Sequence, residues 1–299
     1  MPPVPSYSVR LQSGLTHDRA RIEGASRWVP LAIALAAVLA AYAPILAGMA
    51  IEWFTFPSLS HGFAVPLVSA YLIWRRREVI IAESPGSANV GLVVLAAALG
   101  IFVAGSLSGE TWLSRASFPL ALLGVTLFLA GAGVTGRAWP AIAYLLFMIP
   151  LPYLTLKAVM YQSRLFEAGL TAAALRWLGV PILQQGVMLH LPSVTLEVAD
   201  ACSGVHAVAA LVALGAAYGL VQSRAMWVRV TLVLAAAPLG LASNILRLVL
   251  TALGVYSFGP ITLDSVFHRF SGTTVFMMTV VLLAGLDRLM VRKARAESR

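Results

Sequence analysis

Residues 29–50 read VPLAIALAAVLAAYAPILAGMA, an apolar stretch without a charged side chain. At about 1.5 Å per residue, an α-helix of this length crosses the roughly 30 Å hydrocarbon core of a bilayer. Lipid offers the backbone no hydrogen-bond partners, so such a stretch must be a helix or part of a closed barrel. Because apolar residues follow one another without alternating with polar ones, the stretch predicts a transmembrane helix.

The rest of the chain repeats this pattern. Of its 299 residues, 60% are hydrophobic and only 11% are charged, whereas a soluble domain is about 25% charged. We therefore predict an all-α polytopic membrane protein with about eight transmembrane helices. The expected spans lie near residues 29–50, 62–75, 90–107, 117–134, 138–151, 203–222, 226–254 and 270–290.

Two segments between these spans differ from them. Residues 153–178 mix apolar and charged side chains, which favours a helix lying at the membrane interface, with a ninth span as the alternative. Residues 180–200 resemble two short strands around Pro192-Ser193, which predicts a small β-hairpin on the outer membrane face. The charged residues of the first segment are Lys157, Arg164, Glu167 and Arg176.

The basic residues predict the orientation of the chain. With the N-terminus in the cytoplasm and residues 153–178 at the interface, fifteen of the 21 Lys and Arg residues fall on the cytoplasmic side. This asymmetry follows the positive-inside rule, so we expect both termini in the cytoplasm. The net charge of +9 is then a topology signal and does not indicate a nucleic-acid partner.

The expected organisation is one domain with two short tails. Residues 1–27 are polar and lack the apolar core of a cleavable signal peptide, so the first apolar block is expected to act as an anchor. We predict a cytoplasmic tail over residues 1–27, a single transmembrane domain over residues 28–291 and a basic cytoplasmic tail over residues 292–299.

Helix parity brings four chemically versatile residues to the outer face. Cys202 stands at the start of the sixth predicted span, Arg247 near the outer end of the seventh, and His268 at the start of the eighth. His61, at the start of the second span, arrives at the same face. Residues far apart in the sequence are therefore expected to form one site there.

Cys202 is the only cysteine, which excludes an internal disulfide and a cysteine-rich metal site. At the start of a helix, the dipole favours its thiolate, but the nearby Asp200 opposes a negative charge. A reactive thiol at this position therefore needs a further cation. A cysteine that only packs is the alternative.

Asn244 and Arg247 are three residues apart and share one face of an apolar helix. An ionisable residue within such a helix is costly and is a functional candidate. Arg247 would stabilise a thiolate or an oxyanion. An arginine that only extends its head group to the interface is the alternative.

Two histidines compete for proton transfer. His268 opens a helix after a loop, while His206 is four residues after Cys202 and shares its helix face. Either imidazole suits acid or base catalysis near neutral pH, and either can instead serve only as a hydrogen-bonding group. His61, His206 and His268 lack the His-Glu-x-x-His spacing of zinc hydrolases, so we expect no metal and no cofactor.

Several segments, taken in order, resemble the exosortase family, membrane cysteine transpeptidases related to the archaeosortases. The similar segments cover roughly residues 50–285. They are Ser60-His61-Gly62-Phe63-Ala64-Val65-Pro66, Tyr71-Leu72-Ile73-Trp74-Arg75-Arg76-Arg77, Met148-Ile149-Pro150-Leu151-Pro152, Val198-Ala199-Asp200-Ala201-Cys202-Ser203-Gly204, Asn244-Ile245-Leu246-Arg247, and His268 with Ser271-Gly272.

The resemblance implies a catalytic triad, with Cys202 as nucleophile, Arg247 as transition-state stabiliser and His268 as general acid and base. It implies a protease of the bacterial inner membrane that cuts PEP-CTERM-like sorting signals at the periplasmic face. Such a signal combines a short Pro-containing motif, a membrane helix and a basic tail. The position two after the motif glycine is often Arg or Asn in this family, and here it is His206, which leaves open which histidine transfers protons.

The expected partners are membrane-anchored substrate proteins, the lipid bilayer and a separate companion protein from an exopolysaccharide locus. Three alternatives stay open: a transporter or membrane component of exopolysaccharide export, a metal-dependent intramembrane hydrolase, and a non-catalytic assembly factor. The first would not need Cys202, and the second would be sensitive to chelators.

Overall fold

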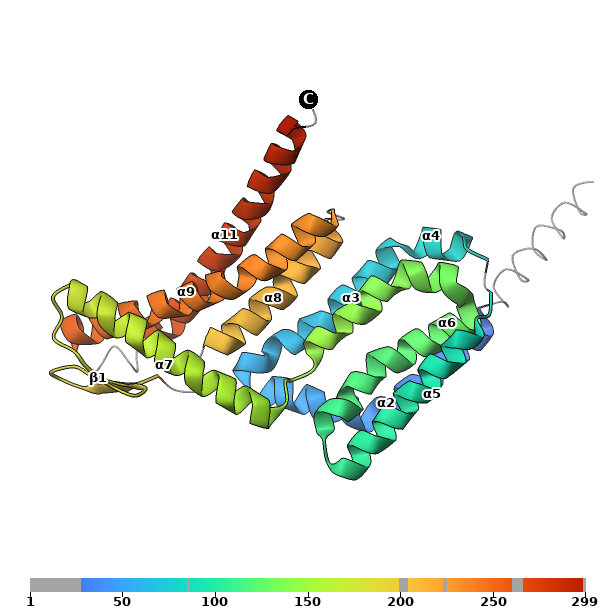
Figure 1. The fold of residues 1–299 in the computed structure, drawn as a ribbon, viewed down its shortest axis with the longest axis horizontal. Helices are drawn as coiled ribbons and strands as arrows, with labels where there is room; N and C mark the ends of the chain where they lie inside the picture. Colours follow the sequence, from blue (N-terminus) through green and yellow to red (C-terminus); the bar gives the residue numbers. More distant parts are fainter. Residues whose placement is uncertain (1–27, 85, 199–203, 223–224, 260–265, 298–299) are drawn as a thin grey trace, which may run out of the picture. The chain divides into compact units, whose positions relative to one another are not determined.

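The structure is a computed structural model that describes residues 28–84, 86–198, 204–222, 225–259 and 266–297 (Figure 1). These residues are mainly helical and include one small sheet. The helices are α2 (Val29–Thr55), η1 (Pro57–Phe63), α3 (Ala64–Arg75), α4 (Arg77–Ala82), α5 (Asn89–Ser108), α6 (Thr111–Tyr144), η2 (Leu145–Met148), α7 (Tyr153–Trp177), α8 (Gly204–Val221), α9 (Met226–Phe258) and α11 (Val266–Glu297). The strands are β1 (Leu183–Gln185), β2 (Met188–His190) and β3 (Thr195–Glu197).

Four helical segments in the described part of the chain are long and apolar enough to cross a membrane. They are α2, α5, the run Thr111–Met148 and α9, and α8 adds a shorter apolar stretch, Val208–Val221. This agrees with a polytopic membrane protein, but the eight predicted spans are not confirmed. The span predicted over residues 62–75 shows the difference, because its α-helix α3 has 12 residues and covers only about 18 Å.

The helix α6 is interrupted at Gly131, inside the span predicted over residues 117–134. Gly131 has φ +80° and ψ 178°, a non-helical backbone conformation that residues other than glycine rarely adopt. The backbone of Gly86 lies against it, since a Cβ at Gly131 would be 3.2 Å from the Gly86 Cα. The Gly86 N–H also donates to Ala130 O at 3.2 Å. The break therefore lies where a loop packs on the helix, and no local sequence pattern marks that contact.

The β-hairpin predicted around Pro192-Ser193 is confirmed and has one strand more than expected. The strands form one antiparallel sheet in the order β1-β2-β3, with Leu189 paired to Gln184 on one side and to Leu196 on the other. The turn between β1 and β2 needs Gly186, whose φ is +60°. Whether the sheet lies on the outer membrane face remains a prediction.

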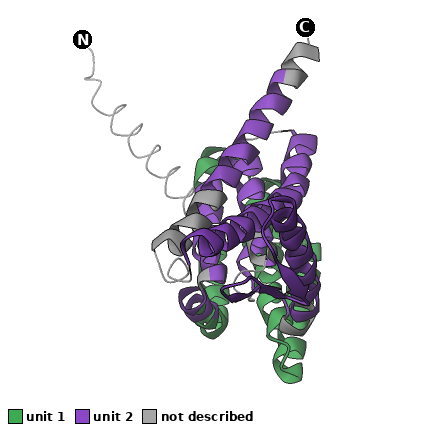
Figure 2. Cartoon of the chain, turned by 90° about the vertical axis from the view of Figure 1, so that its left-hand side faces the viewer, with its two compact units in different colours: residues 1–48, 73–146 green, residues 49–72, 147–299 purple. Residues whose placement is uncertain are grey.

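The residues group into two compact units (Figure 2). Unit 1 comprises residues 1–48 and 73–146, and unit 2 comprises residues 49–72 and 147–299. The prediction of a single transmembrane domain over residues 28–291 stays a prediction.

Unit 1 is built on the close pairing of α5 with α6. A Cβ at Gly124 would lie 2.6 Å from the Leu95 backbone nitrogen, and one at Gly105 would lie 2.6 Å from Ser114 Oγ. Small residues at such positions let the backbones of two membrane helices approach. The contacts pair the start of one helix with the end of the other, so the two helices run antiparallel.

Basic segments that the charge count assigned to one side meet at one end of unit 1. An Nη1 group of Arg76 donates to Arg137 O at 3.0 Å, and Arg137 forms an ion pair with Glu83 at 3.2 Å. The two arginine-containing segments therefore share one end of this unit, as predicted. The assignment of that end to the cytoplasm stays a prediction.

Candidate functional site

The helix α9 carries Asn244 and Arg247 one turn apart, as the sequence predicted. Asn244 is buried, with 5% of its surface exposed, and Arg247 is half-buried. The apolar side chains Val249 and Ala252, one to two turns further on, pack against Leu175 of α7. This part of α9 therefore packs against α7.

Glycines fix how α8 pairs with α9. A Cβ at Gly240 would lie 3.0 Å from a Val208 methyl, and one at Gly215 would lie 3.2 Å from Leu232 O. As the α9 residue number rises, its partner on α8 falls, so the two helices run antiparallel. The start of α8 therefore lies toward the C-terminal half of α9, where Arg247 stands.

The helix α11 packs on the same pair (Figure 1). Leu283 shares a buried cluster with Leu232 of α9, and the Tyr218 hydroxyl of α8 donates to Asp287 Oδ2 at 3.2 Å. A Cβ at Gly215 would lie 3.6 Å from a Leu283 methyl. These contacts make α11 parallel to α8, so both helices begin at the same end of the three-helix group.

His61 lies in η1, a 3₁₀ helix that packs against α8. Its neighbour Gly62 has no room for a side chain, because a Cβ there would overlap the Trp53 indole, about 2.4 Å from its Nε1. The Trp53 Nε1–H donates to Met148 O at 3.1 Å. Two of the segments quoted above for their family pattern, around His61 and Met148, therefore meet at Trp53, which the sequence analysis did not single out.

The chain that leads to Cys202 is anchored at Val198. Its side chain is buried in a cluster with Ala168 and Leu189. Its N–H donates to Val187 O at 3.0 Å, and its carbonyl accepts a hydrogen bond from Arg164 Nη1 at 3.4 Å. Val198 thus uses its side chain and both backbone groups four residues before the cysteine.

A buried acid of α7 that bonds to Asn244 was not predicted from the sequence. Glu167 of α7 is fully buried, and its Oε2 accepts a hydrogen bond from Asn244 Nδ2 at 2.8 Å. Its Oε1 accepts another from Ser163 Oγ at 2.8 Å. The signal was present as the one acid in a helix with three basic residues, but it was interpreted only as evidence for an interfacial segment. That α7 is a helix is confirmed, and its place at the membrane interface stays a prediction.

Part of the predicted site lies outside the described residues, namely Cys202 and Asp200. His206 and His268 belong to the first turns of α8 and α11, but their side chains are not described. Among the side chains that are described, no group of three His, Cys, Asp or Glu residues could hold a metal ion. The side chains of His206 and His268, which the metal-dependent alternative would use, fall outside that search.

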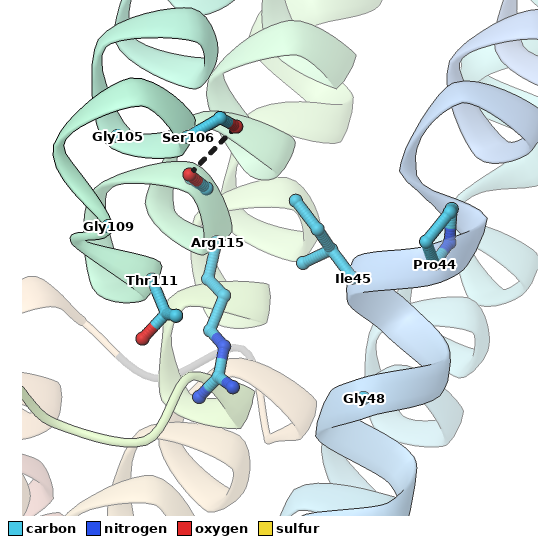
Figure 3. Close-up of a pocket in the computed structure, with 9 residues that line it drawn as sticks. Pro44, Ile45, Gly48, Gly105, Ser106, Gly109, Thr111 and Arg115 are labelled. Atoms are coloured by element: carbon cyan, nitrogen blue, oxygen red, sulfur yellow. Dashed lines mark hydrogen bonds between the residues drawn. The ribbon is translucent and has the colours of Figure 1, made fainter.

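A pocket lies elsewhere, in unit 1, between α2 and the turn that joins α5 to α6 (Figure 3). Its volume is about 290 Å³, and its lining includes Pro44, Gly48, Thr111 and Arg115. In Figure 3 the Arg115 side chain extends from α6 into the space that faces α2. None of the described side chains of the predicted site lines this pocket.

A model of one protein family, described as transmembrane exosortase, matches residues 53–285. The match begins at Trp53 and ends in α11, so it includes η1, α7, the sheet, α8 and α9. No curated protein and no solved structure matches the chain.

Proposed function

Because the chain belongs to the transmembrane exosortase family, we propose that it is a cysteine peptidase or transpeptidase of the bacterial inner membrane. It cleaves the C-terminal sorting signals of membrane-anchored proteins through an acyl-enzyme on Cys202. The family is in general one of sorting-signal proteases embedded in the membrane. The residue roles, the substrate signal and the periplasmic position of the site belong to the proposal.

One observation carries the proposal, namely the common level at which α8, α9 and α11 meet. Gly215, Leu232 and Leu283 mark that level. From it, Arg247 lies fifteen residues further along α9 and His268 fifteen residues back along α11. At a rise of about 1.5 Å per residue, each stretch is about 22 Å long. The start of α8, Gly204, is eleven residues back from Gly215, or about 16 Å. Arg247 and His268 are therefore level with each other, about one helical turn beyond the start of α8. The register supports a site formed by these two residues and the segment before α8, in which Cys202 precedes Gly204 by two residues.

The proposed mechanism is covalent catalysis. The Cys202 thiolate attacks the scissile carbonyl, and the guanidinium of Arg247 stabilises the negative charge on the tetrahedral oxygen. When the intermediate collapses, the C–N bond breaks and His268 donates a proton to the leaving amine. Water or the amine of an acceptor then attacks the thioester and releases Cys202 as thiolate.

The decisive test uses a reporter that ends in a Pro-containing motif, a membrane helix and a basic tail. The variants Cys202→Ala and Cys202→Ser should leave it uncut, although both proteins still accumulate in the membrane. A thioester between Cys202 and the reporter should be trapped with the wild type. Normal cleavage by Cys202→Ala would end the proposal.

The same assay distinguishes the roles of the two histidines. His268→Ala should lower the cleavage rate more than His206→Ala. The reason is that the residue count along α9 and α11 places His268 level with Arg247. The reverse order would assign proton transfer to His206.

The alternatives make different predictions. A transporter or an export component would keep its activity when Cys202 is replaced. A metal-dependent hydrolase would lose activity with chelators and keep it after thiol alkylation.

A further inference from the structure

Glu167 and Asn244 form a polar tie between α7 and α9 in the interior of unit 2. The carboxylate of Glu167 has no exposed surface. Its Oε2 accepts a hydrogen bond from Asn244 Nδ2, and its Oε1 accepts one from Ser163 Oγ, both at 2.8 Å. Asn244 itself is 5% exposed. The two hydrogen bonds therefore compensate a carboxyl group that is removed from solvent.

A buried acid is a costly way to join two helices. The neighbouring contacts of α7 show the ordinary solution, in which Ala168, Ala172 and Leu175 are fully buried against apolar partners. Replacing a buried polar tie by packed apolar side chains is often neutral or stabilising in proteins. An acid at this point is therefore expected to serve something other than stability.

The tie differs from the apolar contacts in what it fixes. Leu175, Val249 and Ala252 set the distance between the helices, but apolar surfaces tolerate small rotations and repacking. A hydrogen bond has a preferred direction, so the bond to Asn244 fixes the rotation of α9 about its axis. Arg247 is three residues further along and shares that face.

We infer that Glu167 is a positioning residue, which orients Arg247 toward the start of α8 by holding Asn244. Glu167 does not touch the substrate and acts through α9. The inference rests on the proposed function, because it assumes that Arg247 stabilises the thiolate of Cys202 and the oxyanion.

The test measures two rates for membranes with equal amounts of each variant. The first is cleavage of the reporter, and the second is alkylation of Cys202 by iodoacetamide at neutral pH. Since the chain has one cysteine, all label incorporated into it reports on Cys202. Alkylation follows the thiolate fraction, so it responds to a displaced Arg247 without any substrate.

The variants Glu167→Ala and Asn244→Ala should each lower cleavage by about 10- to 100-fold, the loss expected when a catalytic group moves by about an ångström. Alkylation should slow in both, as is also expected for Arg247→Ala. The double variant should be no slower than either single one, because the two side chains act through one hydrogen bond. Glu167→Gln should stay within about threefold of the wild type, since its amide can accept from Asn244 and donate to Ser163.

Asp287 provides a matched control, since it is also fully buried and also accepts a hydrogen bond from another helix. It lies nineteen residues after His268 on α11, a distance of about 28 Å along the helix. At equal accumulation, Asp287→Ala and Asp287→Asn should cut the reporter and react with iodoacetamide at the wild-type rates.

The outcomes separate this inference from the proposed function. If Cys202→Ala is inactive while Glu167→Ala and Asn244→Ala cut at the wild-type rate, the inference is wrong and the proposed function stands. Equal losses in Glu167→Ala and Asp287→Ala, or a Glu167→Gln as slow as Glu167→Ala, also overturn it. Cleavage by Cys202→Ala would instead remove the proposed function. If Glu167→Ala does not accumulate, the alkylation rates of Asn244→Ala and Glu167→Gln decide.

Discussion

The buried polar side chains of the two units differ in their chemistry. In the described part of unit 1 they are hydroxyls, of which Thr126 and Thr135 bond one turn back along their own helix, to Leu122 O and Gly131 O at 2.7 Å. Ser114 and Ser117 also bond to other helices, through Phe102 O at 3.4 Å and the Tyr42 hydroxyl at 2.7 Å. In unit 2 they include the only fully buried acids among the described residues, Glu167 and Asp287, and both bond to another helix.

The difference concerns how strictly a polar contact fixes the relative position of two helices. A hydroxyl that bonds one turn back along its helix costs little in a membrane and does not define how two helices meet. A carboxyl or amide that bonds across helices is costly unless its partner is in place, so it defines their relative position. We therefore expect substitutions in unit 1 to change stability, and substitutions of the Glu167–Asn244 contact or of Arg247 in unit 2 to change catalysis.

The largest difference between the units should appear when one arginine of each is replaced. Arg247→Ala should lower reporter cleavage by about 10²–10³-fold, the usual loss when an oxyanion donor is removed. Arg247→Lys should recover only part of it, because an ammonium lacks the planar fork of the guanidinium. Arg137→Ala, which removes the exposed ion pair with Glu83, should cut within twofold of the wild type. A loss with Arg137→Ala as large as that with Arg247→Ala would contradict the division between the units.

Two glycines should give the next largest effects, and in different measurements. Gly62→Ala in unit 2 places a methyl group on the Trp53 indole, and overpacking of this kind costs about 1–3 kcal/mol. Because η1 packs against α8, cleavage per folded molecule should fall as well. Gly131→Ala in unit 1 meets a positive φ, which costs about 1–2 kcal/mol, and should lower the thermal midpoint of the detergent-solubilised protein alone.

The glycine comparison fails if Gly131→Ala slows cleavage at equal amounts of folded protein. A Gly62→Leu variant extends the test, since a larger side chain must displace the Trp53 indole from Met148 O. It should be less active than Gly62→Ala.

Much of this arrangement follows from the sequence, because lipid constrains helices strongly. The lengths of the apolar stretches and the distribution of basic residues predicted that the sixth and eighth spans begin at the same membrane face. The helices α8 and α11 do begin at the same end of the three-helix group that they form with α9. Pro192-Ser193 between alternating residues correctly predicted β2 and β3. Asn244 and Arg247 lie on one face of one helix, as their spacing of three residues within an apolar stretch predicted.

The features that sequence reasoning missed all depend on partners distant in the chain. Trp53 and Met148 are 95 residues apart, and Glu167 and Asn244 are 77 apart. Glu167 in a helix of mixed apolar and charged residues fits an interfacial segment and a buried interhelical contact equally well, and only its partner Asn244 distinguishes the two. Likewise Gly131 resembles any glycine in an apolar run until the Gly86 loop packs on it.

The smallest effects should come from two tyrosines whose hydroxyl groups form hydrogen bonds to another helix. Tyr42 in unit 1 shares a 2.7 Å bond with Ser117 Oγ, which also donates to Ser114 O. Tyr42→Phe leaves that serine satisfied, so it should cost about 0.6 kcal/mol or less, the average for such bonds in membranes. Tyr218 in unit 2 donates to Asp287 at 3.2 Å, and Tyr218→Phe removes a donor from a fully buried carboxyl, so it should cost about 1–2 kcal/mol. Thermal unfolding in detergent measures both, and the double variant Tyr218→Phe with Asp287→Asn should recover part of the loss because a neutral amide needs the hydroxyl less. Equal costs for the two tyrosines would show that the polar contacts of unit 2 are no more demanding than those of unit 1.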